Sequence, residues 1–347
     1  MVPYVDKIQS SSFKEMETLF TIKKITNLFK IPGKKNSIYR SESAGTIPSA
    51  QKIRRRNSFA RFWKTEDLPG IGKEFGFLSP PKTTKIISIY TPKGGVLKST
   101  ITFNLARMLA LNGIKVLVIG LDVQGTITNN LSKSQNYQVE DIDKLPKYRG
   151  LYEGFVEGNE IASTILSTEL QTLYYIPETP TLNLLEQRIR ETNRREHFIQ
   201  ELLEPLLSQY NVILFDNSPN WNFLIQNSLV VATDVLSPIS CDIEAYRSLA
   251  TNIQMINDFK AKMRISWHSY SLISTKLEKN NLSSQIEARY RTSYPQLVLG
   301  GTIRSTIKGQ ESSLEKISAI EKNPLSDLAQ DYYAAVEELW KKINDEV

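Results

Sequence analysis

The sequence of 347 residues has a single cysteine and no run of eighteen consecutive apolar residues. The one cysteine, Cys241, excludes a disulfide within the chain and any metal cluster held by several cysteines of one subunit. It fits a reducing cytosol, and we expect Cys241 to lie in the core. No apolar run follows the charged N-terminus, so we expect neither an export signal nor a membrane-spanning helix, and therefore a cytoplasmic protein.

The charged residues are distributed unevenly along the chain. Residues 1–82 hold 16 lysines and arginines against 7 aspartates and glutamates, whereas residues 83–347 hold 27 against 30. A basic segment beside a near-neutral body favours contact with nucleic acid, although a charge excess is more often an ordinary solvated surface. With 40% apolar and 23% charged residues the chain should fold as a globular protein. Its length suits one large α/β domain and one small domain.

Turn-forming residues at positions 79–84 separate helix-patterned sequence from a second part in which short apolar runs alternate with helical stretches. We place the domain boundary there, with domains over residues 1–82 and 83–347. The alternation predicts an α/β domain with a mostly parallel sheet flanked by helices. The expected strands cover residues 86–90, 116–119, 173–176, 212–215, 235–239 and 270–273.

A last helix is expected over residues 331–344, where apolar side chains recur at helical spacing. Its polar face mixes both charges. A helix that lies on a membrane surface would carry mostly lysine and arginine there, so we expect this helix to pack on the body.

A glycine loop, a Lys-Ser pair and a helix over residues 101–111 follow the strand at 86–90, which is the order of a phosphate-binding P-loop. Glycines let backbone N–H groups close around phosphate oxygens at a helix N-terminus. Lys98 is expected to neutralise the β and γ phosphates of ATP, and Ser99 to ligate Mg²⁺. The alternative is a glycine turn with two solvated lysines. The residues expected to bind ATP are Lys93, Gly94, Gly95, Val96, Leu97, Lys98, Ser99 and Thr100.

Lys93 makes this loop more specific. Residues 93–99 resemble the deviant Walker A motif, Lys-Gly-Gly-x-x-Lys-Ser/Thr, of the ParA/MinD class of P-loop ATPases. The resemblance covers residues 85 to about 345 and implies that Lys93 reaches the phosphates of a partner subunit, so that the active form is a homodimer. Leu97 departs from the glycine that most P-loops place before the second lysine, and it needs a backbone angle that a side chain can adopt.

Two carboxylates complete the expected site. Residues 120–125 resemble the family's Asp-x-Asp-Pro-Gln-Gly, which implies that Asp122 orients the attacking water and, with Lys93 and Lys98, is catalytic. Gly120 replaces the first Asp of that pattern, so we expect slow hydrolysis. Asp216 ends an apolar strand and fits a Walker B carboxylate that holds the Mg²⁺ shell through water. A turn-capping role for Asp122 and a helix-capping role for Asp216 are the alternatives.

The N-terminal region predicts two short helices, over residues 21–29 and 37–45, joined by a turn. With the residues that follow, it resembles the winged helix-turn-helix of MerR-type regulators. The resemblance implies that the second helix enters the major groove and that the wing contacts phosphates. A mobile basic linker is the alternative. The residues expected to contact DNA are Arg40, Arg54, Arg55, Arg56 and Arg61.

With this N-terminal region the resemblance is to the longer plasmid-type ParA proteins. It implies a nucleoid-associated partition ATPase that dimerises on ATP, binds DNA without sequence preference, responds to a ParB-like centromere-binding partner and represses its own operon. A nucleotide-sensing transcriptional repressor with little turnover is the alternative. A MinD-like membrane ATPase is disfavoured by the basic N-terminal region. The basic residues considered for the nonspecific DNA surface are Lys276, Lys279, Arg289, Arg291, Arg304 and Lys308.

Overall fold

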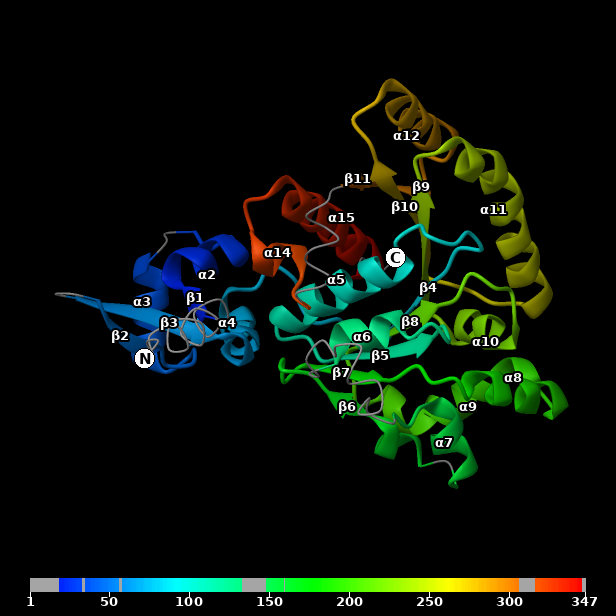
Figure 1. Ribbon diagram of the computed structural model, residues 1–347, viewed down its shortest axis with the longest axis horizontal. Helices are drawn as coiled ribbons and strands as arrows, with labels where there is room; N and C mark the ends of the chain where they lie inside the picture. The colour runs from blue at the N-terminus through cyan, green and yellow to red at the C-terminus, as the bar shows by residue number, and fades with distance from the viewer. Residues whose placement is uncertain are drawn as a thin grey trace, which may run out of the picture.

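The computed structural model describes residues 19–32, 35–55, 58–132, 148–158, 160–305 and 316–344. It contains a small N-terminal region and a larger α/β body, and helices α5 and α15 lie in the body on the side that faces the N-terminal region (Figure 1). The predicted P-loop precedes α5, so the candidate site belongs to the body. Helix α5 lies close to the junction of the two parts.

An eight-stranded sheet forms the centre of the body, in the order β11-β10-β9-β4-β8-β5-β7-β6. Neighbouring strands are parallel except for β6, which pairs antiparallel with β7. This confirms the expected fold class and each strand that the apolar runs predict. The runs do not predict β11, because Gly300 and Gly301 interrupt its apolar pattern. The strands are β4 (Lys85–Ile89), β5 (Val116–Leu121), β6 (Leu166–Ser167), β7 (Leu173–Ile176), β8 (Val212–Asn217), β9 (Asp234–Ser240), β10 (Ser269–Leu277) and β11 (Val298–Arg304).

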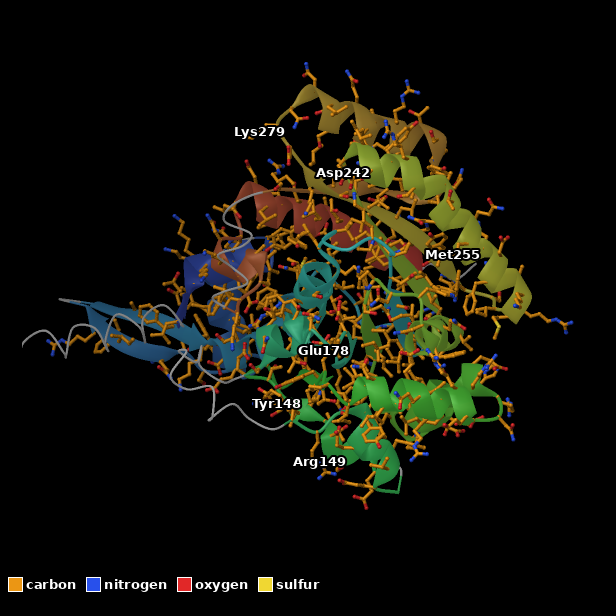
Figure 2. The ribbon with its side chains drawn as sticks, turned by 45° about the vertical axis from the view of Figure 1, so that its right-hand side comes forward. Tyr148, Arg149, Glu178, Asp242, Met255 and Lys279 are labelled. Carbon is orange, nitrogen blue, oxygen red and sulfur yellow. The ribbon has the colours of Figure 1, made fainter. Side chains whose placement is uncertain are left out.

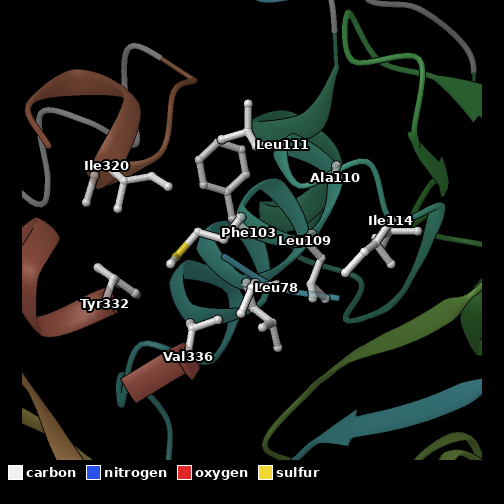
Figure 3. Packing of buried hydrophobic residues seen from close by; sticks show 14 of the residues in the cluster. Leu78, Phe103, Leu109, Ala110, Leu111, Ile114, Ile320, Tyr332 and Val336 are labelled. Atoms are coloured by element: carbon white, nitrogen blue, oxygen red, sulfur yellow. The ribbon is translucent and has the colours of Figure 1, made fainter. Parts of the chain in front are cut away.

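Alternate residues of the strands enter two separate cores, as the period of a β-strand requires. On β5, Val116 and Val118 join the core that contains α5, α14 and α15, while Leu117 and Ile119 join the core that contains α8, α9 and α10. Figure 3 shows the first core, with the α5 side chains facing those of α14 and α15. The helices of the body are α5 (Lys98–Leu111), α6 (Thr126–Leu131), α7 (Leu151–Val156), α8 (Leu182–Glu191), α9 (Phe198–Leu207), α10 (Phe223–Val231), α11 (Ile243–Met263), α12 (Asn281–Ser293), α14 (Ala319–Lys322) and α15 (Asp327–Asn344).

The N-terminal region has two short helices followed by an antiparallel hairpin. Thr21 caps the first helix, since its Oγ1 accepts a hydrogen bond from the Lys24 N–H at 3.2 Å. The second helix ends before Gly45, whose φ of 73° suits glycine at a helix C-terminus. The two predicted helices are present, while the resemblance to a winged helix-turn-helix stays a prediction. The elements are β1 (Leu19–Thr21), α2 (Ile22–Leu28), α3 (Lys35–Ala44), β2 (Gln51–Arg55), β3 (Ser58–Lys64) and α4 (Leu68–Phe75).

The N-terminal region packs tightly on the body. A Cβ added at Gly72 of α4 would lie 1.8 Å from the carbonyl oxygen of Leu111, so α4 meets the end of α5 at backbone distance. On α15, the Tyr333 hydroxyl donates to the Leu28 carbonyl of α2 at 2.7 Å. One apolar core therefore runs from α2 through α4 into the body. The turn residues at 79–84 lie between α4 and β4, but the core does not divide there.

Helix α15 begins four residues before its predicted start and buries its apolar stripe. Trp340 Nε1 donates to the carbonyl of Ser79 at 2.9 Å, which ties the helix to the connection between α4 and β4. The expected packing of this helix on the body is thus confirmed, as is the burial of Cys241.

Candidate functional site

The loop between β4 and α5 has the backbone shape of an anion-binding nest. Gly95 has a φ of 69° and Leu97 a φ of 70°, so two left-handed residues stand just before the N-terminus of α5. Alternation of this kind turns backbone N–H groups toward one concave face, where a phosphate can accept from them. No atom lies within 4 Å of a Cβ added at Gly94, so the loop is open on that side.

Lys98 is the first residue of α5, and its side chain is buried in the loop that it follows. Its Nζ donates to the carbonyl oxygens of Lys93 at 2.9 Å and of Thr91 at 3.2 Å. Burial lowers the pKa of Lys98, and the negative charges of Asp216 and Asp122 oppose this shift. The ammonium is thus held at the loop, where the charges of both carboxylates act on it.

Asp216 lies at the end of β8 and is fully buried. Thr102 Oγ1 donates to its Oδ1 at 2.8 Å, whereas its Oδ2 has no hydrogen-bond partner among the described residues. Burial raises the pKa of Asp216 to about 6, against the hydrogen bonds from Ser99 and Thr102 and the charge of Lys98. A buried carboxylate oxygen without a partner beside a serine hydroxyl suits the water shell of Mg²⁺.

A metal held by protein side chains alone does not fit this site. Over the described ranges, no group of three or more histidines, cysteines, aspartates or glutamates is placed to hold a metal ion. Mg²⁺ usually takes one or two protein ligands together with phosphate oxygens and water, so Ser99 and Asp216 suit a cation that arrives with a nucleotide.

Asp122 follows the end of β5 at the same edge of the sheet. Its Oδ1 accepts from the backbone N–H of Gln124 at 3.1 Å, so the side chain does cap the turn, as the alternative reading of the sequence holds. Its charge also acts on Lys98 and Asp216. The turn therefore fixes a carboxylate near the loop, and the two roles of Asp122 are compatible.

Glu178, labelled in Figure 2, is buried, although the sequence patterns do not single it out. The charges of Asp216 and Asp122 act on it. It stands two residues beyond the end of β7, at the edge of the sheet where β5 and β8 also end. Burial and the charge of Asp216 raise the pKa of Glu178 well above its usual value. A carboxylate just after a predicted strand was the signal available in the sequence.

Lys93 is bound within its own chain rather than pointing away from it. Its Nζ lies 2.7 Å from Asp242 Oδ1 and 3.6 Å from a carboxylate oxygen of Glu244, both at the start of α11. Burial alone would raise the pKa of Asp242, but hydrogen bonds from Lys93, Ser240 and the Ala245 N–H lower it to about 2. The expected contact of Lys93 with a partner subunit would require this ion pair to open.

The residues expected to contact DNA have different environments. Arg40 on α3 and Arg54 on β2 are exposed. Arg61 on β3 instead pairs with Glu42 at 2.9 Å and lies over the ring of Tyr39, so its charge is neutralised inside the region. The side chains of Arg55 and Arg56 lie outside the described residues.

The basic residues considered for the nonspecific DNA surface, in the C-terminal third, also have different environments. Arg291 hydrogen-bonds to Glu287 and to the carbonyl of Leu299, and Arg304 binds Asp331 through two hydrogen bonds of 2.7 Å. Both are occupied within the body. Lys279 and Arg289 are exposed, and Lys308 lies outside the described residues. The Lys276 Nζ lies 3.9 Å from a Cβ added at Gly95, which places this lysine at the P-loop.

A family model described as an AAA domain matches residues 84–268, which is more than half of the chain. The sequence is 25% identical over 252 residues to the cell division protein PomZ of Myxococcus xanthus, which covers 72% of this chain and 76% of that protein. It is 28% identical over 208 residues to the chromosome partitioning protein ParA of the same organism, covering 60% and 70%.

The fold is also similar to that of a plasmid partition protein from Borrelia burgdorferi, solved bound to AMPPNP. The TM-score is 0.59 at 27% identity, and the match covers 76% of this chain and all of the other. In addition, no described helix combines the length and the apolar character that crossing a bilayer requires.

Proposed function

The chain belongs to the AAA domain family, and on this premise we propose that it is a partition ATPase of the ParA type that binds Mg-ATP at the P-loop. The observation that carries the proposal is a buried Lys98 bound to a nest-shaped loop, near an Asp216 whose Oδ2 has no hydrogen-bond partner among the described residues. Relatives that partition chromosomes, and a similar partition protein solved with an ATP analogue, support the choice of process and nucleotide.

Within this site each residue has a defined task. The loop N–H groups and Lys98 bind the phosphates, and Ser99 and Asp216 hold the water shell of Mg²⁺, which neutralises the phosphate charge when it is bound. Asp122 orients the attacking water. Such a reaction needs positioning and charge neutralisation more than covalent chemistry, which this set of residues can supply.

We further propose that ATP binding forms a homodimer through Lys93 and that the dimer holds DNA without sequence preference. A ParB-like partner would then stimulate hydrolysis, and the N-terminal region would bind the operator of the protein's own operon. The exposed Arg40 and Arg54 beside the helix pair and hairpin support the operator contact. Phosphate contacts by such residues weaken binding uniformly when they are removed, so Arg54→Ala should lower operator affinity and its salt dependence.

ATP hydrolysis by the purified chain tests the central proposal. The assay compares the native protein with Lys98→Ala and Asp122→Ala, each with and without nonspecific DNA and a ParB-like partner. We expect slow turnover that DNA and partner stimulate. Lys98→Ala should abolish nucleotide binding, while Asp122→Ala should keep binding and lose about 100-fold or more in turnover.

A nucleotide-sensing repressor is the second candidate, favoured by the ion pair that holds Lys93 away from a partner. In that case ATP binds but turnover is absent and Asp122→Ala changes nothing. That outcome would replace the partition ATPase with the repressor.

A further inference from the structure

The side chain of Glu178 fills the space that a side chain at position 120 would occupy. A Cβ added at Gly120 would lie 2.1 Å from Glu178 Cγ, 2.5 Å from Cδ and 2.7 Å from Oε1. Real Cβ atoms do not approach other carbon atoms this closely. A side chain at position 120 would therefore force Glu178 to move, and the carboxylate of Glu178 stands next to the β5 backbone at this position.

This place in the sheet faces the phosphate site. Gly120 on β5 is the register partner of Asp216 on the neighbouring strand β8. Paired residues of parallel strands direct their side chains to the same face, and Asp216 meets Thr102 of the P-loop helix on that face. The Glu178 carboxylate consequently lies on the side of the sheet where Asp216 and Lys98 lie.

The carboxylate is held firmly but is only partly satisfied. The Thr128 N–H donates to Glu178 Oε2 at 3.3 Å, and the Glu178 N–H donates to Thr128 Oγ1 at 2.7 Å. Oε1 is buried, and no group in the described part of the chain makes a hydrogen bond of good geometry to it, although the nearby Asp122 N–H lowers the pKa of this carboxyl. A native protein rarely leaves a buried carboxylate oxygen without a donor unless a ligand, an ion or water completes it. Asp216 Oδ2, on the same face, is likewise buried and has no hydrogen-bond partner among the described residues.

We propose that Glu178 is a positioning residue of the nucleotide site. From the segment after β7 it supplies the carboxylate that a residue at position 120 of β5 would otherwise supply. Together with Asp216 it accepts hydrogen bonds from the water shell of Mg²⁺, and through Thr128 it fixes the segment that carries Asp122. The proposal rests on the proposed Mg-ATP site. Gly120 departs from the family pattern. The proposal explains this departure, because Glu178, which follows β7, takes the place of a carboxylate at position 120 of β5.

A purely structural role for Glu178 is the competing explanation, because its two hydrogen bonds to Thr128 join β7 to α6. The two roles differ in what they change. A structural residue alters the melting temperature without nucleotide, whereas a residue that orders the water shell alters the Mg²⁺ concentration at which nucleotide binds.

The experiment is a Mg²⁺ titration of the binding of a fluorescent ATP analogue, with melting temperatures measured in parallel. Glu178→Gln keeps the shape and can still accept from the Thr128 N–H, but it cannot ionise beside a bound Mg²⁺. It should raise the half-saturating Mg²⁺ concentration roughly 10-fold, the lower end of the usual effect of outer-shell groups. The exposed Glu160→Gln is the matched control and should leave the titration unchanged.

Relocation of the carboxylate gives the sharper test. Gly120→Asp alone adds a side chain that collides with Glu178, so it should weaken Mg²⁺-dependent binding. Gly120→Asp with Glu178→Ala removes the collision and restores a carboxylate to the same face, and the Mg²⁺ midpoint should return to within about threefold of native.

The proposal is overturned if Glu178→Gln has the native Mg²⁺ midpoint, or if the double variant is no better than Gly120→Asp. If the native chain itself binds no nucleotide in the presence of Mg²⁺, the proposed function falls and this proposal falls with it. If the native chain binds nucleotide with Mg²⁺ and only Glu178→Gln needs more Mg²⁺ to do so, the result supports both the proposed function and the role of Glu178.

Discussion

Leu97 adopts a left-handed backbone conformation that costs a residue with a side chain about 1 to 2 kcal/mol. The cost is tolerated because the conformation turns the N–H groups of the loop toward the phosphate position. Its side chain packs against the core beside α5, which offsets part of the strain. The departure from glycine that the sequence displays therefore leaves the loop shape intact.

The ion pair between Lys93 and Asp242 leads to a prediction about dimer formation. Asp242→Asn should let the ATP-bound chain dimerise at a lower concentration, because Lys93 no longer leaves a carboxylate to reach a partner. A partly exposed pair stabilises by about 1 kcal/mol or less, which corresponds to a factor of up to about five for each lysine. Light scattering after size exclusion with non-hydrolysable ATP measures the shift.

Two further variants control this experiment. Asp242 Oδ1 also caps α11 by accepting from the Ala245 N–H at 2.8 Å, and asparagine keeps such a cap. Asp242→Ala loses the cap as well and should lower the melting temperature, which Asp242→Asn should not. If Lys93→Ala dimerises with ATP as the native chain does, Lys93 takes no part in the interface.

The residues of the site differ in how visible they are in the sequence. Lys98, Ser99 and Asp216 could be predicted because each has a fixed place in a P-loop or at the end of an apolar strand. Glu178 could be recognised only as a carboxylate after a strand, and Asp242 could not be placed at all, because their neighbours in space are about 50 and 150 positions away in the chain. Only the pairing of strands and the packing of α11 bring them to the site.

The P-loop helix α5 is fastened to α14 by a buried ion pair. Arg107 on α5 is 1% exposed and donates to Glu321 through two hydrogen bonds of 2.7 Å, while Glu169 lies 2.6 Å from its third nitrogen. Burial alone would raise the pKa of Glu321, but Arg107 and Ser318 lower it. The contribution of this carboxylate to stability is therefore present above its unfolded pKa, about 4.3, and is lost as the pH falls through the lower folded value.

Removing one member of the Arg107–Glu321 ion pair should lower the free energy of unfolding more than removing both. Glu321→Ala leaves a guanidinium buried beside only the half-exposed Glu169 and should lower the free energy of unfolding by about 3 to 5 kcal/mol. Arg107→Met combined with Glu321→Met should cost clearly less, since no buried charge is left. Chemical denaturation measures both values.

The exposed pair Arg188 and Glu191 on α8 provides the comparison for this prediction. Glu191→Gln should cost about 0.5 kcal/mol or less, because exposed helix pairs contribute little. A double Met variant that is as unstable as Glu321→Ala would mean that the loss comes from packing or from the capping of α14 and not from the unpaired charge.

Elements with a strong period were predictable, and those shaped by packing were not. The expected helix at the C-terminus is present because its apolar stripe has helical spacing, but its first turn begins earlier, at Asp327. Strand β11 has glycines at positions 300 and 301, and the structure explains them: a Cβ at Gly301 would lie 2.5 Å from the backbone of Ala335 on α15. The close approach of α15 thus explains the glycine at position 301, and the alternation of apolar residues cannot reveal such an approach.

The continuous core of the whole molecule couples the N-terminal region to the ATPase body. Lys30 lies over the ring of Tyr333 and pairs with Glu337, and both partners stand on α15. The P-loop helix packs against α14 and α15 (Figure 3). Helix α4 meets its C-terminal end at Leu111. Turn residues at 79–84 make the sequence look divided there, yet the two parts share one apolar core. Composition reveals the turn residues but not the contacts between the segments on either side of them.

This coupling predicts a single cooperative unfolding transition for the full chain in calorimetry. Gly72→Ala is the variant to test it, because its Cβ has no room against the Leu111 carbonyl and must push α4 away from α5. Overpacking of this kind should cost about 1 to 3 kcal/mol, and the whole transition should move to lower temperature without splitting. Glu74→Ala, at an exposed position of α4, is the control and should leave the transition in place. Two transitions, of which only the smaller one moves in Gly72→Ala, would mean that the region before residue 83 unfolds on its own and that the shared core adds little to the stability of the P-loop helix.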